Sequence, residues 1–431
     1  MAVERGLLPL TAATDPRGRL SIGGVDLVDL ADEYGTPLFV YDEAHLRARC
    51  REAVAAWGDG VAYATKAFLC RAMARLAADE GMSLDVSTGG ELHVALSAGV
   101  DPDRLVLHGN NKSDEELAAA LGAGVGRIVV DSFDEIDRLQ RLLESGGGSG
   151  PGDRPRVLVR VTPGVEVHTH EFVRTGQDDS KFGFGLASGA ADRAVARLGS
   201  LTDDGLLELV GVHAHLGSQV FALAPFAEAV GLLARFFAPL GLPELVVGGG
   251  LGVPYVTGEE APTLGDWAEA VRRACADAGI PDGVRVTAEP GRSIVAAAAV
   301  TLYRVGTIKP VPGHRTYVAV DGGMSDNPRP VLYGSGYEAF LPRETDVARP
   351  LAVRVVGKHC ETGDLLVPEA YLPSDVVVGD VLSTPVTGAY GHSMASNYNK
   401  VPRPAVVFVA DGKTRVVVRR ETYDDLVRLD V

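Results

Sequence analysis

Cysteine is scarce in this 431-residue chain, and its few positions are scattered. There is no CxxC pair and no zinc-finger ligand spacing among the four cysteines, which are Cys50, Cys70, Cys275 and Cys360. This usage predicts unpaired thiols in a reducing, cytoplasmic environment. Three of the four lie in helical, Ala- and Leu-rich contexts, where a cysteine usually serves as a small core residue. Cys360 lies instead in KHCETGD, which has the character of a turn.

Long apolar runs and an excess of positive charge are also missing. The opening MAVERGLLPLTAATD has no basic stretch followed by an apolar run, so we expect no secretory signal, and no window is expected to reach the length of a membrane span. Lys and Arg number 41 against 57 Asp and Glu, a formal net charge of −16. Nucleic acid and anionic membranes repel such a chain, so we expect neither as a partner, although a local basic patch could still bind a small anion.

The chain does contain a regular alternation of strand and helix patterns. With 46% hydrophobic and 23% charged residues it has the composition of a soluble globular protein, and its length predicts two domains. Short β-branched runs alternate with segments of helical period, and these runs are 61–65, 83–87, 105–108, 127–131, 156–161, 209–215, 244–249 and 284–289. Such a series predicts a (β/α)8 TIM-like barrel over 37–290, with an open doubly wound sheet as the alternative.

The pattern changes after Gly291. Residues 291–431 contain strand signals separated by Gly, Pro and Asp turns with little helix between them, which predicts a mostly antiparallel β domain. The N-terminal segment 1–36 also carries strand signals, and we expect it to pack with this domain. The Gly-, Ser- and Pro-rich stretch 144–155 predicts a mobile surface loop.

Reactive and glycine residues gather after the predicted barrel strands, where the active sites of such barrels lie. Lys66 follows the first strand in an apolar setting that favours an uncharged, nucleophilic amine, although a lysine after a strand is more often a solvated flank. Gly248–Gly250 follow the seventh strand, where backbone N–H groups commonly approach a phosphate, although they could also form a loose turn. His215 ends the sixth strand. Glu289 follows the eighth, where it could instead pair with Arg292.

The histidine pairs do not predict a metal site. We expect His213 and His215 to point to opposite faces of their strand, which excludes joint ligation, and His168 and His170 lack a complete ligand set. A phosphate cradle, an amine nucleophile, a flat histidine ring and a carboxylate at one rim describe a pocket for pyridoxal 5'-phosphate instead. In such a pocket the carboxylate keeps the pyridine nitrogen protonated, so that the ring can act as an electron sink.

An ordered set of motifs runs through nearly the whole chain: GTPLFVYD, YATKAF, HGNNKS, SKFGFG, HLGSQ, GGGLG, EPGR, DGGMSDNPRPVLYG, CETGD and GAYGHSMASNYN. In these motifs the sequence resembles the diaminopimelate decarboxylases, within the barrel-fold (fold type III) pyridoxal phosphate decarboxylases and racemases. The departures are small. Thr362 stands where the family often has Ser, the residue at His392 varies among relatives, and the stretch 144–155 is long.

The resemblance implies roles for individual residues. Lys66 would form a Schiff base with the cofactor, His215 would stack on its ring, and Glu289 would contact the pyridine nitrogen. Further cofactor contacts would come from Ser218, Gly249, Gly250, Pro290, Gly291, Arg292 and Tyr390. Substrate contacts would come from Arg292, Arg329, Tyr333, Glu361 and Tyr390. Cys360 would protonate the substrate carbanion after CO2 leaves. The family is typically a head-to-tail homodimer in which Cys360 and Glu361 enter the partner's site.

The implied reaction is decarboxylation of meso-diaminopimelate to L-lysine, the last step of lysine biosynthesis. The far end of this substrate carries both an ammonium and a carboxylate, which calls for an acid such as Glu361 and a cation such as Arg292 or Arg329. Either arginine could instead serve the cofactor phosphate or the dimer interface. The alternatives are a same-fold decarboxylase acting on ornithine, arginine, carboxynorspermidine or a carrier-linked amino acid, and a non-catalytic pyridoxal phosphate-binding protein.

Overall fold

The computed structural model describes residues 3–146, 154–164 and 180–431, and the chain separates into two compact units. We call the unit of residues 50–252 and 261–291 the barrel unit, and the unit of residues 1–49, 253–260 and 292–431 the β unit. His168 and His170, and most of the predicted loop 144–155, lie outside the described residues.

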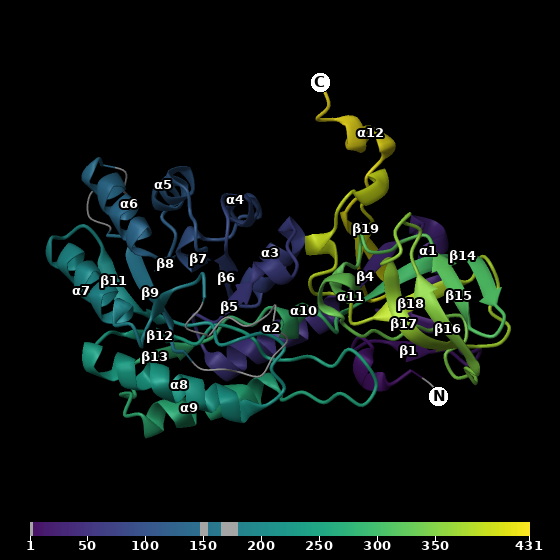
Figure 1. Ribbon diagram of the computed structural model, residues 1–431, viewed down its shortest axis with the longest axis horizontal. Coiled ribbons are helices and arrows are strands. Elements are labelled where there is room, and N and C mark those ends of the chain that lie inside the picture. The colour runs from purple at the N-terminus through teal and green to yellow at the C-terminus, as the bar shows by residue number, and fades with distance from the viewer. Residues whose placement is uncertain (1–2, 147–153, 165–179) are drawn as a thin grey trace. The chain divides into compact units, whose positions relative to one another are not determined.

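Parallel strands in chain order form the core of the barrel unit (Figure 1). In its described part they are β5 (Ala62–Ala64), β6 (Ser83–Val86), β7 (Leu105–Leu107), β8 (Arg127–Val130), β9 (Arg156–Thr162), β11 (Glu208–His213), β12 (Glu244–Val246) and β13 (Arg285–Thr287). The Ala62 amide donates to the Ala288 carbonyl at 3.0 Å and the Ala64 amide to the Pro290 carbonyl at 3.2 Å. These bonds join the first strand to the last. The predicted barrel is confirmed, and the open sheet is excluded.

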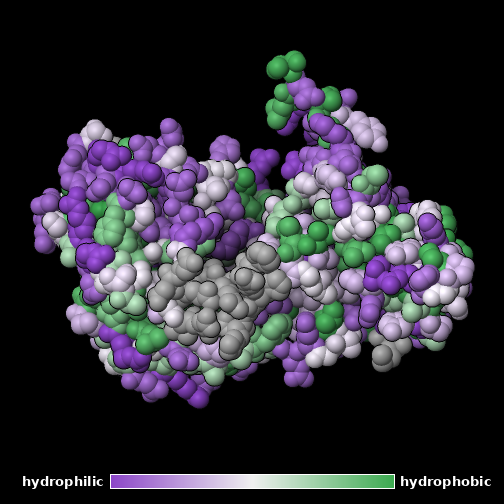
Figure 2. All heavy atoms as spheres, in the orientation of Figure 1, coloured by the Kyte–Doolittle hydropathy of each residue, from purple (hydrophilic) through white to green (hydrophobic). Residues whose placement is uncertain are grey.

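Helices alternate with these strands, as their apolar periodicity predicts. They are α3 (Arg71–Asp79), α4 (Gly89–Ser97), α5 (Asp114–Ala123), α6 (Phe133–Glu144), α7 (Ala190–Asp203), α8 (Leu223–Phe237) and α9 (Leu264–Asp277). Ser113 begins α5 with a capping box, in which its side chain accepts from the Glu116 amide and the Glu116 carboxylate accepts from the Ser113 amide. Figure 2 shows mostly hydrophilic side chains over α5 and α6, because their apolar residues face the barrel.

Helix α8 corrects one expectation about apolar runs. The segment Leu223–Leu240 has a mean hydropathy of 1.4 over 18 residues, so by length and composition it could cross a membrane. Its buried residues recur at helical spacing along one face: Phe226, Ala229, Val230, Leu233, Ala234 and Phe237. The high hydropathy of this segment is therefore explained by a barrel helix that buries one apolar face.

The β unit is built on a sheet with the strand order β17-β16-β15-β14-β4-β19-β20, and β18 also pairs with β14. The strands are β4 (Leu38–Asp42), β14 (Ala299–Val311), β15 (Arg315–Val320), β16 (Leu351–Val356), β17 (Leu365–Leu372), β18 (Val381–Pro385), β19 (Ala405–Ala410) and β20 (Lys413–Val418). Most pairings are antiparallel, which confirms the predicted class. The exceptions are β15 with β16 and β19 with β4.

The barrel unit ends at Gly291, within one residue of the predicted boundary at 290, but it begins at Cys50 and not at the predicted residue 37. Strand β4 pairs with β14 and β19, so Leu38–Asp42 belongs to the sheet of the β unit although it precedes the barrel in sequence. All five of its residues are buried, as expected of a central strand covered on both faces. The N-terminal helix α1 (Leu27–Tyr34) also packs in this core, through Leu27, Leu30 and Ala31.

Candidate active site

A pocket of about 280 Å³ lies at the C-terminal ends of the barrel strands, and we call it the upper pocket. Its lining includes Lys66, Asp85, Ser87, His108, Gly109, Asn110, Arg160, Phe182, His213, His215 and Glu289. Three predicted site residues therefore meet here: the lysine, the ring-stacking histidine and the carboxylate. The ends of parallel strands meet at one edge of a barrel, so residues distant in sequence converge there.

Lys66 lies in a short 3-10 helix, Thr65–Ala67, directly after β5. The Thr65 hydroxyl donates to the Asp85 carbonyl at 2.7 Å, and Ala67 and Phe68 are fully buried, so the backbone on both sides is held firmly. The lysine itself is exposed. This corrects the expected poor hydration of its amine, because the neighbouring apolar residues point into the core while Lys66 points into the pocket.

Glu289 is held between two histidines that come from different strands. Its Oε1 lies 2.9 Å from Nε2 of His108 and its Oε2 lies 2.9 Å from Nε2 of His213. All three residues are buried. Burial opposes the charged carboxylate, yet the two histidines hold the pKa of Glu289 well below its usual value. Because a carboxylate can only accept, both Nε2 atoms carry protons, and Glu289 is ionised.

The pKa values of the two histidines are shifted in opposite directions. Burial lowers the pKa of His213 to about 4, so that ring is neutral. The pKa of His108 is raised although burial opposes the charge, because Asp85 and Glu289 both attract its proton, and Asp85 Oδ1 lies 3.7 Å from His108 Nε2. Ligand atoms of His108, His213 and Glu289 lie within 4.8 Å of one another, a spacing that a metal ion could use. The two 2.9 Å hydrogen bonds account for this spacing without an ion.

His215 lies near His213 at the end of β11, and both line the upper pocket. The predicted opposite orientation of the two rings is wrong, because residues two apart along an extended strand share a face. Burial and the positive charges of Lys66 and Arg160 lower the pKa of His215 well below its usual value. Its imidazole is therefore a neutral, flat ring at the pocket wall.

The glycines after β12 make room for a close approach of backbone. Gly248 has a φ of +69° and Gly250 a φ of +118°, both in the left-handed region that disfavours other residues. A Cβ on Gly248 would lie 2.5 Å from the Ala214 carbonyl oxygen, and a Cβ on Gly249 would lie 2.5 Å from that of Glu289. Between these segments only bare backbone fits, as a cradle of N–H groups for a phosphate requires.

The end of the EPGR motif packs equally closely on the first strand. A Cβ on Gly291 would lie 2.9 Å from both Cβ and the carbonyl oxygen of Ala64. Residues 289–291 thus adjoin the strand that carries Lys66. The predicted cofactor residues of the barrel unit fit pyridoxal phosphate in kind: an amine, a neutral ring, an ionised carboxylate and a glycine backbone cradle.

The predicted substrate residues belong to the β unit, where two arginines and three tyrosines form a cluster. Nη1 of Arg292 donates to the Tyr255 hydroxyl at 2.8 Å, and its guanidinium lies 4.7 Å from the Tyr390 ring centroid. Nη1 of Arg329 donates to the Tyr337 hydroxyl at 2.7 Å, and its guanidinium lies 4.1 Å from the Tyr255 ring centroid. Arg329 is only 5% exposed and forms no ion pair with any described residue. A buried cation without a counter-ion suits an anionic ligand.

Cys360, Glu361 and Tyr333 also lie in the β unit. Cys360 is exposed in the loop between β16 and β17, and its amide donates to Asn399 Oδ1 at 3.0 Å. Asp364 steadies this loop by accepting from the His359 amide at 2.8 Å. Glu361 is exposed, and Tyr333 ends the short helix α11 (Arg329–Tyr333).

Several site residues were not singled out from the sequence. Asp85, His108 and Arg160 line the upper pocket, and Tyr255 and Tyr337 hold the two arginines. The first three had a readable signal, since each is a polar residue within or directly after a buried strand: Asp85 in β6, His108 after β7 and Arg160 in β9. The tyrosines had none, because each lies in an irregular segment.

Comparisons with known proteins agree with this geometry. Residues 43–296 match the family described as "Pyridoxal-dependent decarboxylase, pyridoxal binding domain". The chain is 47% identical to the diaminopimelate decarboxylase of Mycobacterium tuberculosis, covering 98% of this chain and 97% of that protein. It is 50% identical to that of Actinosynnema pretiosum subsp. auranticum, covering 100% and 96%.

Solved structures give the same result. The crystal structure of the diaminopimelate decarboxylase from M. jannaschii matches with a TM-score of 0.89 and 31% identity over 98% of both chains. The Helicobacter pylori enzyme complexed with L-lysine matches with a TM-score of 0.84 and 31% identity over 94% of this chain and 98% of that one. This chain therefore belongs to the pyridoxal-dependent decarboxylases and, within them, to the diaminopimelate decarboxylases.

Proposed function

We propose that this protein is a pyridoxal phosphate-dependent enzyme that decarboxylates meso-diaminopimelate to L-lysine and CO2. The observation that carries this proposal is the ionised Glu289, held by two histidines in a pocket it shares with Lys66 and His215. Relatives named diaminopimelate decarboxylase across nearly the full length support it. So do the similar enzymes solved with L-lysine, the expected product.

The residues of the barrel unit would hold the cofactor. When bound, pyridoxal phosphate supplies an electron sink for the pair of electrons left behind by departing CO2. Lys66 would attach it covalently, the neutral ring of His215 would lie against its face, and the glycine cradle at Gly249 and Gly250, with Ser218, Pro290, Gly291 and Arg292, would hold its phosphate side. Glu289 would keep a proton on the pyridine nitrogen, because an ionised carboxylate stabilises a neighbouring cation.

The β unit would bind the substrate. Arg329, buried without a counter-ion, suits a substrate carboxylate. Both arginines contact Tyr255: Arg329 lies over its ring, and Arg292 donates to its hydroxyl. Glu361 would take the distal ammonium, while Tyr333 and Tyr390 would line the site. Lysine and ornithine present a lone ammonium at that end, which two arginines would repel. This charge pattern favours an amino-acid end group and hence diaminopimelate.

Cys360 would return a proton to the substrate α-carbon after CO2 leaves. Its exposure within one chain suits a residue that acts in the partner subunit of a homodimer. Exposed apolar side chains on the β unit would gain cover in such a dimer, namely Val331, Leu332, Tyr423, Val427 and Leu429. We further propose a cytoplasmic location, in keeping with four free cysteines.

A substrate panel tests the proposal. The purified, cofactor-loaded protein is given meso-diaminopimelate, ornithine, arginine, lysine and carboxynorspermidine in parallel, and CO2 release and the amine product are measured. We expect lysine from diaminopimelate and turnover at least about 100-fold lower with the substrates that lack a distal carboxylate, as expected when a buried arginine loses its partner. Equal or faster turnover of ornithine or arginine would overturn the substrate assignment. If no substrate of the panel is turned over although the cofactor is bound, the proposed decarboxylase activity is rejected.

A further inference from the structure

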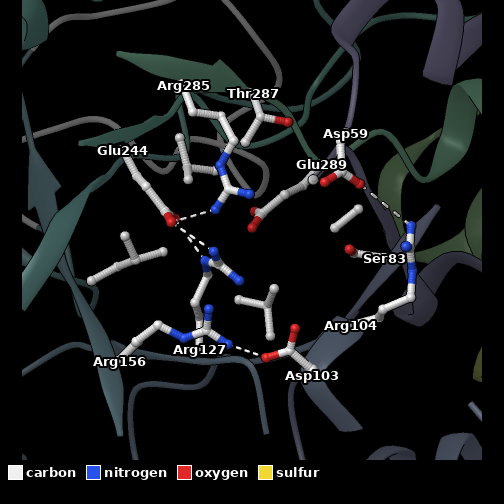
Figure 3. A pocket seen from close by; sticks show the side chains of 15 residues that line it. Asp59, Ser83, Asp103, Arg104, Arg127, Arg156, Glu244, Arg285, Thr287 and Glu289 are labelled. Carbon is white, nitrogen blue, oxygen red and sulfur yellow. Dashed lines mark hydrogen bonds and ion pairs between the residues drawn. The ribbon is translucent and has the colours of Figure 1, made fainter. Parts of the chain in front are cut away.

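A second cavity enters the barrel from the N-terminal ends of its strands, and we call it the lower cavity. Its volume is about 230 Å³, and charged side chains line its rim. Figure 3 shows Arg127 and Arg285 reaching toward Glu244, and Arg156 toward Asp103, around this space. Nothing in the proposed reaction uses it.

The lower cavity exists because one side of the barrel interior is built from small residues. Bulky branched side chains usually fill barrel interiors. Val106, Leu158 and Val246 do so on β7, β9 and β12. On the side of β5 and β6 the corresponding lining consists of Gly60, Ala62 and Ser83, which leave the volume unfilled.

The lower cavity extends along β13 as far as Glu289. Arg285, Thr287 and Glu289 are two residues apart, so they face the same way, and all three line the cavity. Thr287 is 3% exposed, and its hydroxyl has no hydrogen-bond partner among the described residues. Glu289 also lines the upper pocket. The same glutamate therefore borders both spaces.

Water is the ligand that suits this cavity. Each of its arginines has an acidic partner, and the pairs are Arg127 and Arg285 with Glu244, Arg156 with Asp103, and Arg104 with Asp59. The balanced charge gives no strong selection for an anion. A polar cavity of this size has room for several waters at roughly 30 Å³ each, and one of them would satisfy the buried Thr287 hydroxyl.

We propose that the lower cavity holds a column of water that hydrates Glu289 from the side opposite the cofactor. This inference rests on the proposed function, because it takes the cofactor to lie in the upper pocket. A buried carboxylate is destabilised by loss of hydration. His108 and His213 offset part of that loss, whereas the nearby carboxyl group of Asp85, whose Oδ1 lies 3.7 Å from His108 Nε2, opposes the charge of Glu289. Water from below stabilises the charge further without entering through the reacting face. Thr287 is thus a positioning residue for this water.

Two variants remove the water in different ways. Thr287→Val keeps the shape of the side chain and removes the hydroxyl, and Ala62→Leu fills the cavity from β5. The matched control is Thr384→Val, because Thr384 is 1% exposed, its hydroxyl also lacks a partner among the described residues, and it lies on β18 of the β unit. The readouts are the Kd for pyridoxal phosphate, from an absorbance titration of the cofactor-free protein, and a high-resolution crystal structure of the loaded enzyme.

We expect ordered waters between Arg285 and Glu289 in the loaded wild-type enzyme. We also expect cofactor binding about tenfold weaker in Thr287→Val, because an ordered water that supports the Glu289 side of the site is lost, and a Kd within twofold of wild type in Thr384→Val. A dry cavity would overturn the inference, as would unchanged binding in Thr287→Val, which remains decisive if Ala62→Leu fails to fold. Borohydride reduction distinguishes failure of this inference from failure of the proposed function. A label on Lys66 together with a dry cavity rejects the water column alone. No label on Lys66 rejects the proposed function.

Discussion

Replacing Glu289 with glutamine tests the centre of the proposed site, because the substitution keeps the shape and removes the charge. The carboxylate accepts two hydrogen bonds of 2.9 Å from His108 and His213. A glutamine has one accepting oxygen, so one histidine loses its acceptor, at about 1.5–3 kcal/mol of folding free energy for a bond to a charged group. The negative charge that would hold the pyridine proton is lost as well. Removal of one such preorganised electrostatic group costs about 10²–10³-fold in kcat.

The assay follows lysine formation and CO2 release from meso-diaminopimelate by Glu289→Gln. We expect kcat to fall by about 10²–10³-fold. Bound cofactor should still be detectable by borohydride labelling of Lys66, because the amine is untouched. Glu421→Gln is the control: Glu421 pairs with Arg403 in the β unit, and we expect its loss to leave kcat within twofold. A Glu289→Gln enzyme that binds cofactor and retains kcat within twofold of wild type would refute the role derived from the two histidine contacts.

Four further predictions follow from the same geometry. Lys66→Ala should fold with unchanged circular dichroism yet lose both the yellow colour and the borohydride label, and a variant that stays yellow and active would exclude the lysine. Cys360→Ala should keep the colour and lose most turnover, and mixing it with Lys66→Ala should restore some activity through shared sites; no recovery despite proven subunit exchange would count against sharing. Arg329→Lys should raise KM for diaminopimelate by about 10–100-fold, because lysine cannot form the planar, bidentate pairing of a guanidinium with a carboxylate. An unchanged KM would show that the substrate carboxylate binds elsewhere. Burial raises the pKa of Asp326 to about 7, so the folded state holds a proton that the unfolded state releases near pH 4, and stability should fall as pH rises from about 4 to 7. Asp326→Asn should flatten that trend in a series of Tm measurements, and an identical slope in the variant would contradict it.

Much of the barrel could be read from local patterns, because each strand and helix carries its own periodicity. All the predicted strand runs of the barrel became strands. Most are shorter than predicted, whereas 156–161 lengthened to β9 (Arg156–Thr162) and 209–215 shifted to β11 (Glu208–His213). The assignment of Leu38–Asp42 to a domain could not be predicted in this way. Its five buried residues suit any central strand, and only its pairing with β14 and β19 shows which sheet it joins. Pairing between segments hundreds of residues apart leaves no local signal.

The sequence by itself determined which chemical groups are present: the lysine after the first strand, the glycines after the seventh and the carboxylate after the eighth, all marked by strand ends. The tertiary structure decided how these groups are held. His108 and His213 reach Glu289 across 181 and 76 residues of chain, and Glu289 borders both the upper pocket and the lower cavity. The physical reason is closure of the barrel. Side-chain periodicity is a local property, whereas the meeting of strand ends in one ring depends on hydrogen bonds between the first strand and the last.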